Sequence, residues 1–360
     1  MTTSTSSPTT GAATGAGERT LHVLIPTYKP VGGIVKVFDY VLHARALGYR
    51  VSVGCAEEMA PDLPVFDIER MRGLADDPLV EFHARDKVKV GPADLFLVSL
   101  PKQYNAAYRD LPAGMTPARI IHIIQNIRHI NPTWRLGEGT RILTRPASRI
   151  SINSIVAEAI APWLDERGLH HVINLGHESG VFARQRSGPL SQGEGPVRIA
   201  YTTWKSDVGE RVAGLMRHDP RVEFRAIRET VSWEELTELY HWADVFLGTP
   251  HREEGMYLPG LEAMAAGNVV VLPDAGGNMA YSRPGENCLL VDFESAPSYV
   301  AAIEELLAMP AEQVDRLRQG GYAVLPDFDL EHERAGFAEF LDRLWEHVAR
   351  LEQTPAEAEE

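Results

Sequence analysis

The stretch "LHVLIPTYKPVGGIVKVFDYVLHARALGYRVSVG" (residues 21–54) decides the fold class of this chain. Its first apolar run, 21–26, is short and ends at a proline, which is typical of a buried strand. Apolar residues then recur at helical spacing as far as Leu47, and Gly48 is placed to end that helix. A second apolar run, 50–54, predicts another strand. Strand, helix and strand in this order form a βαβ unit, which implies parallel pairing and a right-handed crossover.

The same alternation continues along the chain in two series. In the first series we predict a helix at 155–168 and strands at 94–100, 119–125 and 171–176. A polar segment, 182–196, holds Gly and Pro without periodicity and predicts an interdomain linker. In the second series we predict helices at 232–243, 297–309 and 331–351 and strands at 197–203, 222–227, 244–249, 268–273 and 287–292. We therefore expect an α/β protein with two open, mostly parallel sheets in tandem, which bind ligands at the carboxyl ends of their strands.

Composition and charge exclude several classes of protein. The chain has 360 residues, enough for two domains, and its formal net charge is −15. Nucleic acids and anionic membranes attract basic surfaces, so we expect neither nucleic-acid binding nor stable membrane insertion. No apolar run reaches the ~18–20 residues of a membrane-spanning helix, and the first residues lack the apolar core of a secretory signal. Cys55 and Cys288 fit no metal or redox spacing, so we expect buried free thiols and a cytoplasmic protein.

A second stretch, "HREEGMYLPGLEAMAAGNVVV" (251–271), places two glutamates with seven residues between them. We expect Glu254 in a loop and Glu262 in the first turn of a short helix that ends at Gly267. Amides at the start of such a helix can hold a diphosphate, and carboxylates can accept hydrogen bonds from vicinal hydroxyls. A diphosphate flanked by a ribose and a hexose is a nucleotide sugar, and Lys205 is the best candidate for a neighbouring cation. For Glu262 alone, a favourable interaction with the helix dipole is the competing explanation.

The segment "EEGMYLPGLEAMAAGNVVVLPDAGGNMAYSRPGENCLLV" (253–291) resembles the glutamate-x7-glutamate signature of retaining GT-B glycosyltransferases, family 4 type. Further segments are similar to that family in the same order, and the resemblance covers roughly residues 21–325. These segments are 30–53, 150–160, 171–182 and 232–247.

The resemblance implies the GT-B fold, which consists of two tandem Rossmann-like parallel-sheet domains facing across a cleft. A disordered tail (1–19) would precede an acceptor-side N-terminal domain (20–182), and a linker (183–196) would lead into a nucleotide-sugar-binding domain (197–330). A helix (331–351) would then cross back to the N-terminal domain, and an acidic tail (352–360) would follow.

The resemblance also implies roles for individual residues. Glu254 would contact hydroxyls of the donor sugar, Glu262 would bind the ribose diol, and Lys205 would stabilise the departing diphosphate. The remaining donor contacts would come from backbone amides and loops that approach the phosphates or the base. These positions are Gly32, Gly33, Met256, Tyr257, Leu258 and Arg228.

The chain departs from the family pattern at several positions. The arginine that commonly precedes the domain-two lysine is absent, so Arg252 is a candidate replacement. Gln125 stands where the family usually has a histidine, and we expect it to be catalytic together with Glu254 and Lys205. Met256–Tyr257 replace a common phenylalanine–glycine pair. The polar residues after Gln125 follow a predicted strand and are expected to face the cleft. They are candidates for contacting the acceptor, although the usual polarity of a loop explains them equally well. These are Asn126, Arg128, His129 and Asn131, and His177 and Glu178 could border the same cleft.

The family implies transfer with retention, by front-face attack in which a donor phosphate oxygen takes the acceptor proton. No cofactor or obligatory metal is needed for this chemistry. We expect GDP-mannose or a UDP-hexose as donor, a saccharide or small molecule as acceptor, and we leave a homodimer open. A dehydrogenase is disfavoured because "PTYKPVGG" lacks G-x-G-x-x-G, and a glycosidase because nothing raises the pKa of one carboxyl group. The alternatives are an epimerase, a phosphorylase or a non-catalytic sugar-binding protein.

Overall fold

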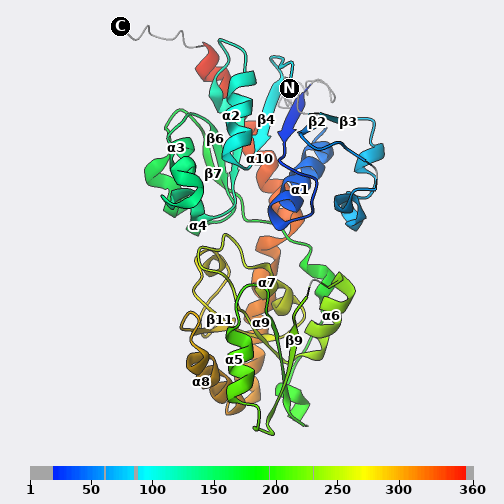
Figure 1. Ribbon diagram of the computed structural model, residues 1–360, viewed down its shortest axis with the longest axis vertical. Coiled ribbons are helices and arrows are strands. Elements are labelled where there is room, and N and C mark those ends of the chain that lie inside the picture. Colours follow the sequence, from blue (N-terminus) through cyan, green and yellow to red (C-terminus); the bar gives the residue numbers. More distant parts are fainter. Residues whose placement is uncertain (1–18, 61, 85–87, 194, 230, 354–360) are drawn as a thin grey trace, which may run out of the picture. The chain divides into compact units, whose positions relative to one another are not determined.

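The computed structural model describes residues 19–60, 62–84, 88–193, 195–229 and 231–353 (Figure 1). The predicted tails, 1–19 and 352–360, lie outside these residues except for Arg19, Glu352 and Gln353. The chain divides into two compact units, one up to His122 and from Leu344 onward, the other Ile123–Arg343. The predicted linker at 183–196 lies inside the second unit, so the proposed domain boundaries stay predictions.

The first sheet has seven strands in the order β3-β2-β1-β4-β5-β6-β7. Strand β5 runs across the division between the units, because Ile120–His122 pair with β4 and Ile124 O accepts from Ile152 N at 3.3 Å. The strands are β1 (Thr20–Leu24), β2 (Arg50–Cys55), β3 (Val80–Ala84), β4 (Asp94–Val98), β5 (Ile120–Ile124), β6 (Ser148–Ser151) and β7 (His170–Val172). The helices of this part are α1 (Gly32–Ala46), α2 (Pro101–Asp110), α3 (Glu138–Leu143) and α4 (Ser154–Ile160).

The opening βαβ unit is confirmed. Strands β1 and β2 pair in parallel with Leu21 opposite Val51, and α1 connects them. Gly48 follows the helix with φ of 86°, a left-handed conformation that costs a glycine little. Its amide donates to Arg45 O at 3.0 Å, which satisfies one of the carbonyls at the end of α1.

The second sheet has five parallel strands in the order β12-β11-β10-β8-β9, all within the second unit (Figure 1). Side chains alternate between its faces. Ile199 and Val271 join a core with residues of α5 and α8, whereas Phe246 packs against Tyr240 of α6 at 5.3 Å on the other face. The strands are β8 (Val197–Thr202), β9 (Val222–Ile227), β10 (Val245–Leu247), β11 (Val269–Pro273) and β12 (Cys288–Val291). The helices are α5 (Val208–Leu215), α6 (Trp233–Trp242), α7 (Leu258–Ala265), α8 (Ala296–Leu307) and α9 (Ala311–Val324). The expected class, α/β with two parallel sheets, is confirmed.

Some sequence-based boundaries were wrong. The predicted helix at 155–168 ends at Ile160 and continues only as a 3-10 turn, because Pro162 lacks the amide that the next turn requires. Gly168 lies in an irregular segment where a Cβ would come within 1.7 Å of Ala147 O. Hydrophobic patterning also missed β3, β6 and the helices α2, α3, α5 and α9.

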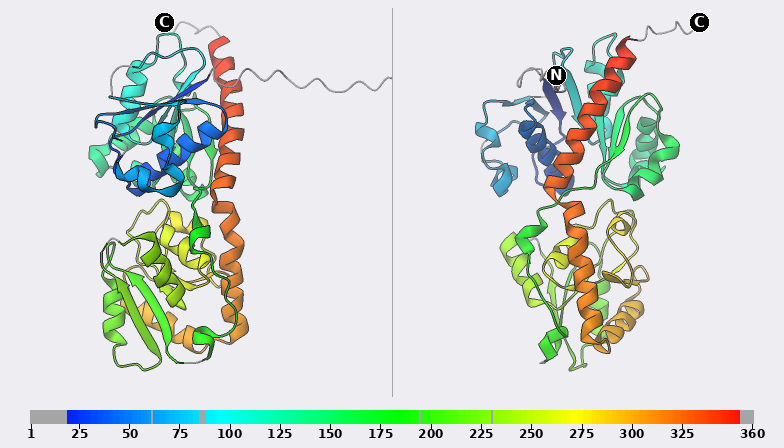
Figure 2. Two further views of the ribbon diagram at one scale, coloured as in Figure 1. Left: turned by 90° about the vertical axis from the view of Figure 1, so that its right-hand side faces the viewer. Right: turned by 180° about the vertical axis from the view of Figure 1, so that it is seen from behind.

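The last helix, α10 (Leu330–Gln353), is unbroken along its length (Figure 2). In the first unit, Glu352 near its end receives two hydrogen bonds of 2.7 Å from Arg119, and Trp345 donates to the Tyr49 hydroxyl at 2.7 Å. Cys55 and Cys288 are both buried free thiols, as predicted. Among the described residues, none of the helices is both apolar enough and long enough to cross a membrane.

Candidate functional site

Lys205 and Glu254 meet in loops that follow two neighbouring strands. Strands β8 and β10 pair in parallel, so their carboxyl ends lie at the same edge of the sheet. The Lys205 Nζ lies 2.6 Å from Glu254 Oε1, and the glutamate is only 7% exposed. The ammonium also lies 5.2 Å from the centroid of the Tyr257 ring. The structure therefore brings together the two residues that the sequence singled out as carboxylate and cation.

The backbone around Glu254 is held by a facing glycine loop. The Glu254 amide donates to Ala275 O at 2.9 Å, and the Gly277 amide donates to Glu254 O at 2.8 Å. A Cβ on Gly277 would lie 1.9 Å from Gly255 O, so only glycine permits this approach. Glu254 Oε1 also accepts from the His251 amide at 3.2 Å, whereas Oε2 has no hydrogen-bond partner among the described residues. One carboxylate oxygen is thus anchored and the other is available.

Tyr257 closes the loop that carries Glu254. Its hydroxyl accepts a hydrogen bond from the Thr249 amide at 3.0 Å, and its carbonyl accepts from the Tyr281 hydroxyl at 2.7 Å. Burial raises the pKa of Tyr257 to about 12, so the phenol stays neutral. Gly248 makes room for the ring, since a Cβ there would lie 3.1 Å from Tyr257 Cε1. Tyr257 is therefore a fixed anchor for the loop that carries Glu254.

The amides of Met256, Tyr257 and Leu258 precede or open α7. Tyr257 is the N-cap residue and provides no side-chain cap, and Pro259 is the second helical residue. Within the described part of the chain, none of the three amides donates a hydrogen bond to another residue. The first amides of a helix have no partner inside it, so these groups can receive an anion.

Glu262 does not lie in the first turn of α7, contrary to the prediction, because the helix begins at Leu258. The helix-dipole explanation for this residue therefore fails. Its carboxylate is 7% exposed and accepts at Oε1 from His177 Nε2 at 2.9 Å and at Oε2 from the Tyr240 hydroxyl at 2.8 Å. Burial, followed by the charge of Glu262, raises the pKa of Tyr240 well above its usual range, so this hydroxyl remains a donor. Each carboxylate oxygen retains a second lone pair for a ligand hydroxyl.

The sequence did not predict that His177 and Tyr240 both bind the Glu262 carboxylate. Tyr240 lies on the apolar side of a predicted helix, where a tyrosine is expected to pack, and its hydroxyl contact depends on how α6 meets α7. His177 was noted only as a residue that could border a cleft. No local pattern connects residues 177, 240 and 262.

Gln125 lies directly after β5 and is half-buried. Within the second compact unit, its backbone packs against the Glu254 loop, since a Cβ on Gly255 would lie 1.7 Å from Gln125 O. The Asn153 side chain also holds the Glu254 loop, because its Nδ2 donates a hydrogen bond to Gly255 O at 2.7 Å. The backbone of Gln125 therefore lies next to the Glu254 loop, and the catalytic role of its side chain stays a prediction.

The side chain of His129 is buried within the second unit, although the sequence predicted that it faces a cleft; its acceptor role stays a prediction. It is 1% exposed, its Nδ1 lies 3.2 Å from Asn126 O, and its ring lies 4.8 Å from that of Trp134. Burial lowers the pKa of His129 to about 4, so the ring is neutral at physiological pH. The side chain of Asn126 is also engaged, because its Oδ1 accepts from the Arg128 amide at 3.0 Å as a helix cap. Asn131 instead donates to Glu253, at 3.2 and 3.3 Å to the two oxygens.

Two further arginines predicted to contact the donor have other partners in the structure. Arg228 pairs with Glu210 at 2.8 Å, and the Arg252 guanidinium lies 4.1 Å from the centroid of the Phe293 ring. Gly32 and Gly33 are the first residues of α1 in the first unit, and their role toward the donor stays a prediction. The described residues contain no group of three His, Cys, Asp or Glu side chains arranged to hold a metal ion.

Comparison with known proteins finds a family match within the second unit and one curated relative. Residues 227–324 match the family model for Glycosyl transferases group 1. Over 156 residues the chain is 31% identical to the D-inositol 3-phosphate glycosyltransferase of Nocardia farcinica, covering 39% of this chain and 34% of that protein. The chain thus matches about a third of the length of this curated relative.

Solved structures match nearly the whole chain at low sequence identity. HepE of Anabaena, in complex with UDP and glucose, has a TM-score of 0.63 at 14% identity, covering 91% of this chain and 100% of that one. Sucrose-phosphate synthase of Thermosynechococcus elongatus has a TM-score of 0.64 at 16% identity, with coverage of 91% and 100%. The family match and these neighbours together support a glycosyltransferase. The chain has the GT-B fold, and its residues 227–324 are similar to the Glycosyl transferases group 1 family.

Proposed function

We propose that this protein is a retaining glycosyltransferase that moves a hexose from a nucleotide-diphosphate sugar to a hydroxyl of a saccharide or small-molecule acceptor. The observation that carries this proposal is the 2.6 Å ion pair between Lys205 and Glu254, in the loops at the carboxyl ends of β8 and β10. The amides of 256–258 lie in the same loop as Glu254. A cation, an available carboxylate oxygen and free amides are what a sugar bonded to a diphosphate requires.

Each group has a distinct part in the chemistry. The Lys205 ammonium and the amides before α7 stabilise the charge that develops on the departing diphosphate. Glu254 Oε2 accepts hydrogen bonds from sugar hydroxyls and holds the ring for cleavage of its C1–O bond. Glu262 accepts from the ribose diol while His177 and Tyr240 hold it in place. In front-face transfer a donor phosphate oxygen takes the acceptor proton, so the protein needs no covalent nucleophile and no obligatory metal.

We favour a UDP-hexose over GDP-mannose as donor. The structures of HepE, a neighbour by fold, contain UDP, UDP with glucose, or UDP-glucose. The name of the Nocardia relative makes D-inositol 3-phosphate the first acceptor to test. We assign the reaction to the cytoplasm, where nucleotide sugars are made. Whether the protein forms a homodimer is left for a measurement of its mass in solution.

The test combines nucleotide release with product stereochemistry. Purified protein is incubated with UDP-glucose or GDP-mannose, with and without acceptors, in the presence of EDTA. We expect nucleotide release that depends on acceptor, and an anomeric configuration, read by NMR, that matches the donor. Conversion of the donor sugar without transfer would indicate an epimerase, and tight binding without turnover would indicate a sugar-binding protein. An inverted product would refute retention.

A further inference from the structure

A pocket rich in arginine lies in the second unit, away from Lys205 and Glu254. It has a volume of ≈ 420 Å³, and its walls carry four arginines and one carboxylate, Asp244. The arginines are Arg184, Arg186, Arg198 and Arg318. This volume lies within the range of small-molecule sites. The cluster is conspicuous because the chain as a whole has a formal net charge of −15.

The pocket lies at the opposite edge of the sheet from the candidate donor site. Arg198 is the second residue of β8, and Asp244 immediately precedes β10, so both stand at amino ends of strands. Lys205 and Glu254 follow the carboxyl ends of the same strands. A strand of six residues, such as β8, spans roughly 20 Å, so one ligand cannot fill both places.

The segment 184–188, which contributes two of the arginines, is held firmly. The Arg184 amide donates to Ala265 O at 2.9 Å, and the Arg186 amide donates to the Tyr322 hydroxyl at 3.0 Å. The Gly188 amide donates to Asp315 Oδ1 at 2.8 Å. The guanidinium groups therefore project from a fixed backbone rather than a free loop, which favours a preorganised site.

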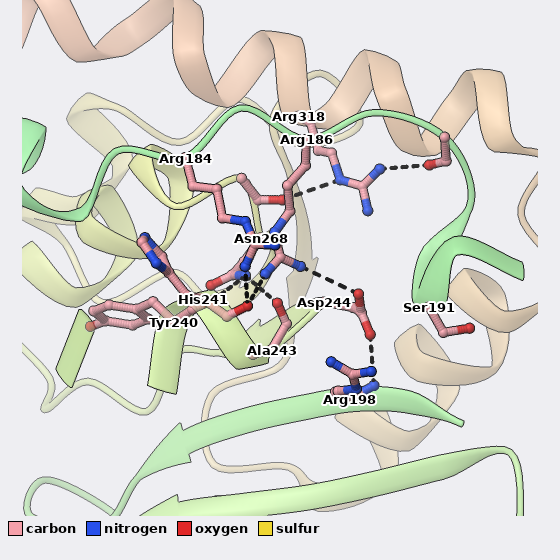
Figure 3. Close-up of polar contacts among 12 residues, drawn as sticks. Arg184, Arg186, Ser191, Arg198, Tyr240, His241, Ala243, Asp244, Asn268 and Arg318 are labelled. Atoms are coloured by element: carbon pink, nitrogen blue, oxygen red, sulfur yellow. Dashed lines mark hydrogen bonds and ion pairs between the residues drawn. The ribbon is translucent and has the colours of Figure 1, made fainter. Parts of the chain in front are cut away.

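Some of the arginine contacts have a structural explanation. Arg184 Nη1 donates to His241 O at 2.7 Å, and Arg186 Nη2 donates to the same carbonyl, which lies in the last turn of α6. Arg186 Nη1 also lies 3.3 Å from Asp244 Oδ1. Figure 3 shows Asp244 between Arg186 and Arg198, while Arg318 reaches the pocket from α9. Basic side chains at a helix C-terminus satisfy its last carbonyls and complement its dipole.

Capping of α6 leaves many donors unused. The Arg198 guanidinium makes no hydrogen bond with any residue in the described part of the chain, and Arg184 makes one of the five it can donate. Arg186 Nε is buried without a hydrogen-bond partner among the described residues, which is unusual in a folded protein. Burial, followed by the charge of Arg184, lowers the pKa of Arg186 to about 10, so the cations repel one another while remaining charged. Two carboxylates pair with the four arginines, Asp244 with Arg186 and Asp315 with Arg318 at 3.2 Å, so positive charge remains in excess.

We propose that this pocket is a binding site for a phosphate-class oxyanion, distinct from the donor site. A phosphate group presents several oxygens that match the forked geometry of arginine, and the exposed guanidinium groups of Arg184 and Arg198 have unused donors for it. The shared chemistry is a phosphate group, carried by inorganic phosphate, by pyrophosphate or by a phosphorylated small molecule. The site does not depend on the proposed transferase activity.

The test measures binding of inorganic phosphate and of pyrophosphate by calorimetry at constant ionic strength, with nitrate as the monovalent control. The test variant is Arg184→Gln combined with Arg198→Gln, because both side chains are exposed and neither is part of the core. The matched control is Arg316→Gln, an exposed arginine on the same helix as Arg318. Lys205→Met separates the two sites, since it removes the cation of the donor site.

We expect the double variant to weaken phosphate or pyrophosphate binding by about tenfold or more, in line with the loss of charge-assisted hydrogen bonds. Arg316→Gln and Lys205→Met should leave at least one binding event at wild-type affinity. Binding abolished by Lys205→Met but unchanged in the double variant would assign all anion binding to the donor site and overturn the proposal. Absence of binding at millimolar concentrations of both probes in the wild-type protein would also overturn it. Stronger binding of pyrophosphate than phosphate would favour an elongated ligand.

Discussion

Lys205 and Glu254 are separated by forty-nine positions in the sequence, and their side chains form a 2.6 Å ion pair that is mostly buried. Each charged side chain finds its oppositely charged partner far away in the sequence. The pair forms because β8 and β10 are parallel, hydrogen-bonded neighbours. The loops that carry Lys205 and Glu254 therefore both begin at the carboxyl-end edge of the sheet. In the proposed reaction a donor diphosphate would share the ammonium with Glu254, which would couple sugar binding to leaving-group stabilisation.

Glu254→Gln should lower turnover much more than donor affinity. The amide keeps the shape of the side chain but removes the negative charge that aligns Lys205 and accepts from sugar hydroxyls. We expect a loss of about 10²–10³-fold in kcat, as for a group that acts mainly in the transition state. Steady-state kinetics with calorimetric donor titration checks this, with the exposed Glu238→Gln as control. Near-wild-type turnover in Glu254→Gln would remove Glu254 from the mechanism.

Lys205→Met should reduce turnover and weaken nucleotide-diphosphate binding together, because the cation faces the phosphates before and during the reaction. In combination with Glu254→Gln, the losses should be less than additive, since each single variant already breaks the 2.6 Å contact. A double-mutant cycle on kcat/KM measures this coupling. Fully additive losses would mean that the two residues act independently, despite the contact.

Tyr240→Phe should weaken donor binding through Glu262 and lower stability. It removes the 2.8 Å hydrogen bond to Glu262 Oε2 and leaves a buried carboxylate with one partner fewer. We expect a loss of about 1.5–3 kcal/mol in the free energy of unfolding. We also expect a higher donor KM with a smaller change in kcat, and reduced discrimination between a ribonucleotide and a 2′-deoxyribonucleotide. Unchanged discrimination with lower stability alone would make Tyr240 purely structural.

Gly277→Ala should distort the loop that supports Glu254. The added methyl group would lie 1.9 Å from Gly255 O, and neither backbone segment can yield without moving the other. We expect a loss of about 1–3 kcal/mol in stability and a fall in turnover. Gly214→Ala is the matched control, because this glycine lies in α5 with nothing within 4 Å of a Cβ, and alanine should stabilise the helix by ~0.5–1 kcal/mol. Equal effects of both substitutions would refute the packing argument.

Stability should fall between about pH 6.5 and pH 4 in part because of His129, whose pKa burial lowers to about 4 from 6.5. The unfolded chain binds a proton to this histidine in that window and the folded chain does not. The contribution of His129 to the free energy of unfolding is therefore fully present above its pKa in the unfolded chain, and it is lost as the pH falls through this window. The full effect is on the order of 3 kcal/mol. Urea unfolding against pH should be flatter for His129→Phe than for wild type or the exposed His218→Asn.

Much of the fold could be predicted because its signals are local. The hydrophobic run of β1, the periodicity of α1 and Gly48 together specify a βαβ unit, and each is read within a few residues. The mostly polar helix α2 and the short helix α5 have weaker hydrophobic patterns and were missed. Pro162 shortened a predicted helix through a backbone effect that periodicity does not register.

The sequence by itself determined the α/β class, the parallel pairing and the residue types near the donor site, because strand and helix periodicities and the spacing of Glu254 and Glu262 are properties of short segments. Only the tertiary structure decided which of these side chains contact one another and which are buried. It joined Tyr240 and His177 to Glu262, buried His129 against Trp134, and gathered arginines from a connecting segment, β8 and α9 into one pocket. These relationships depend on which strands are neighbours and how helices cover them, and contacts between residues far apart in the chain leave no periodicity in any single segment.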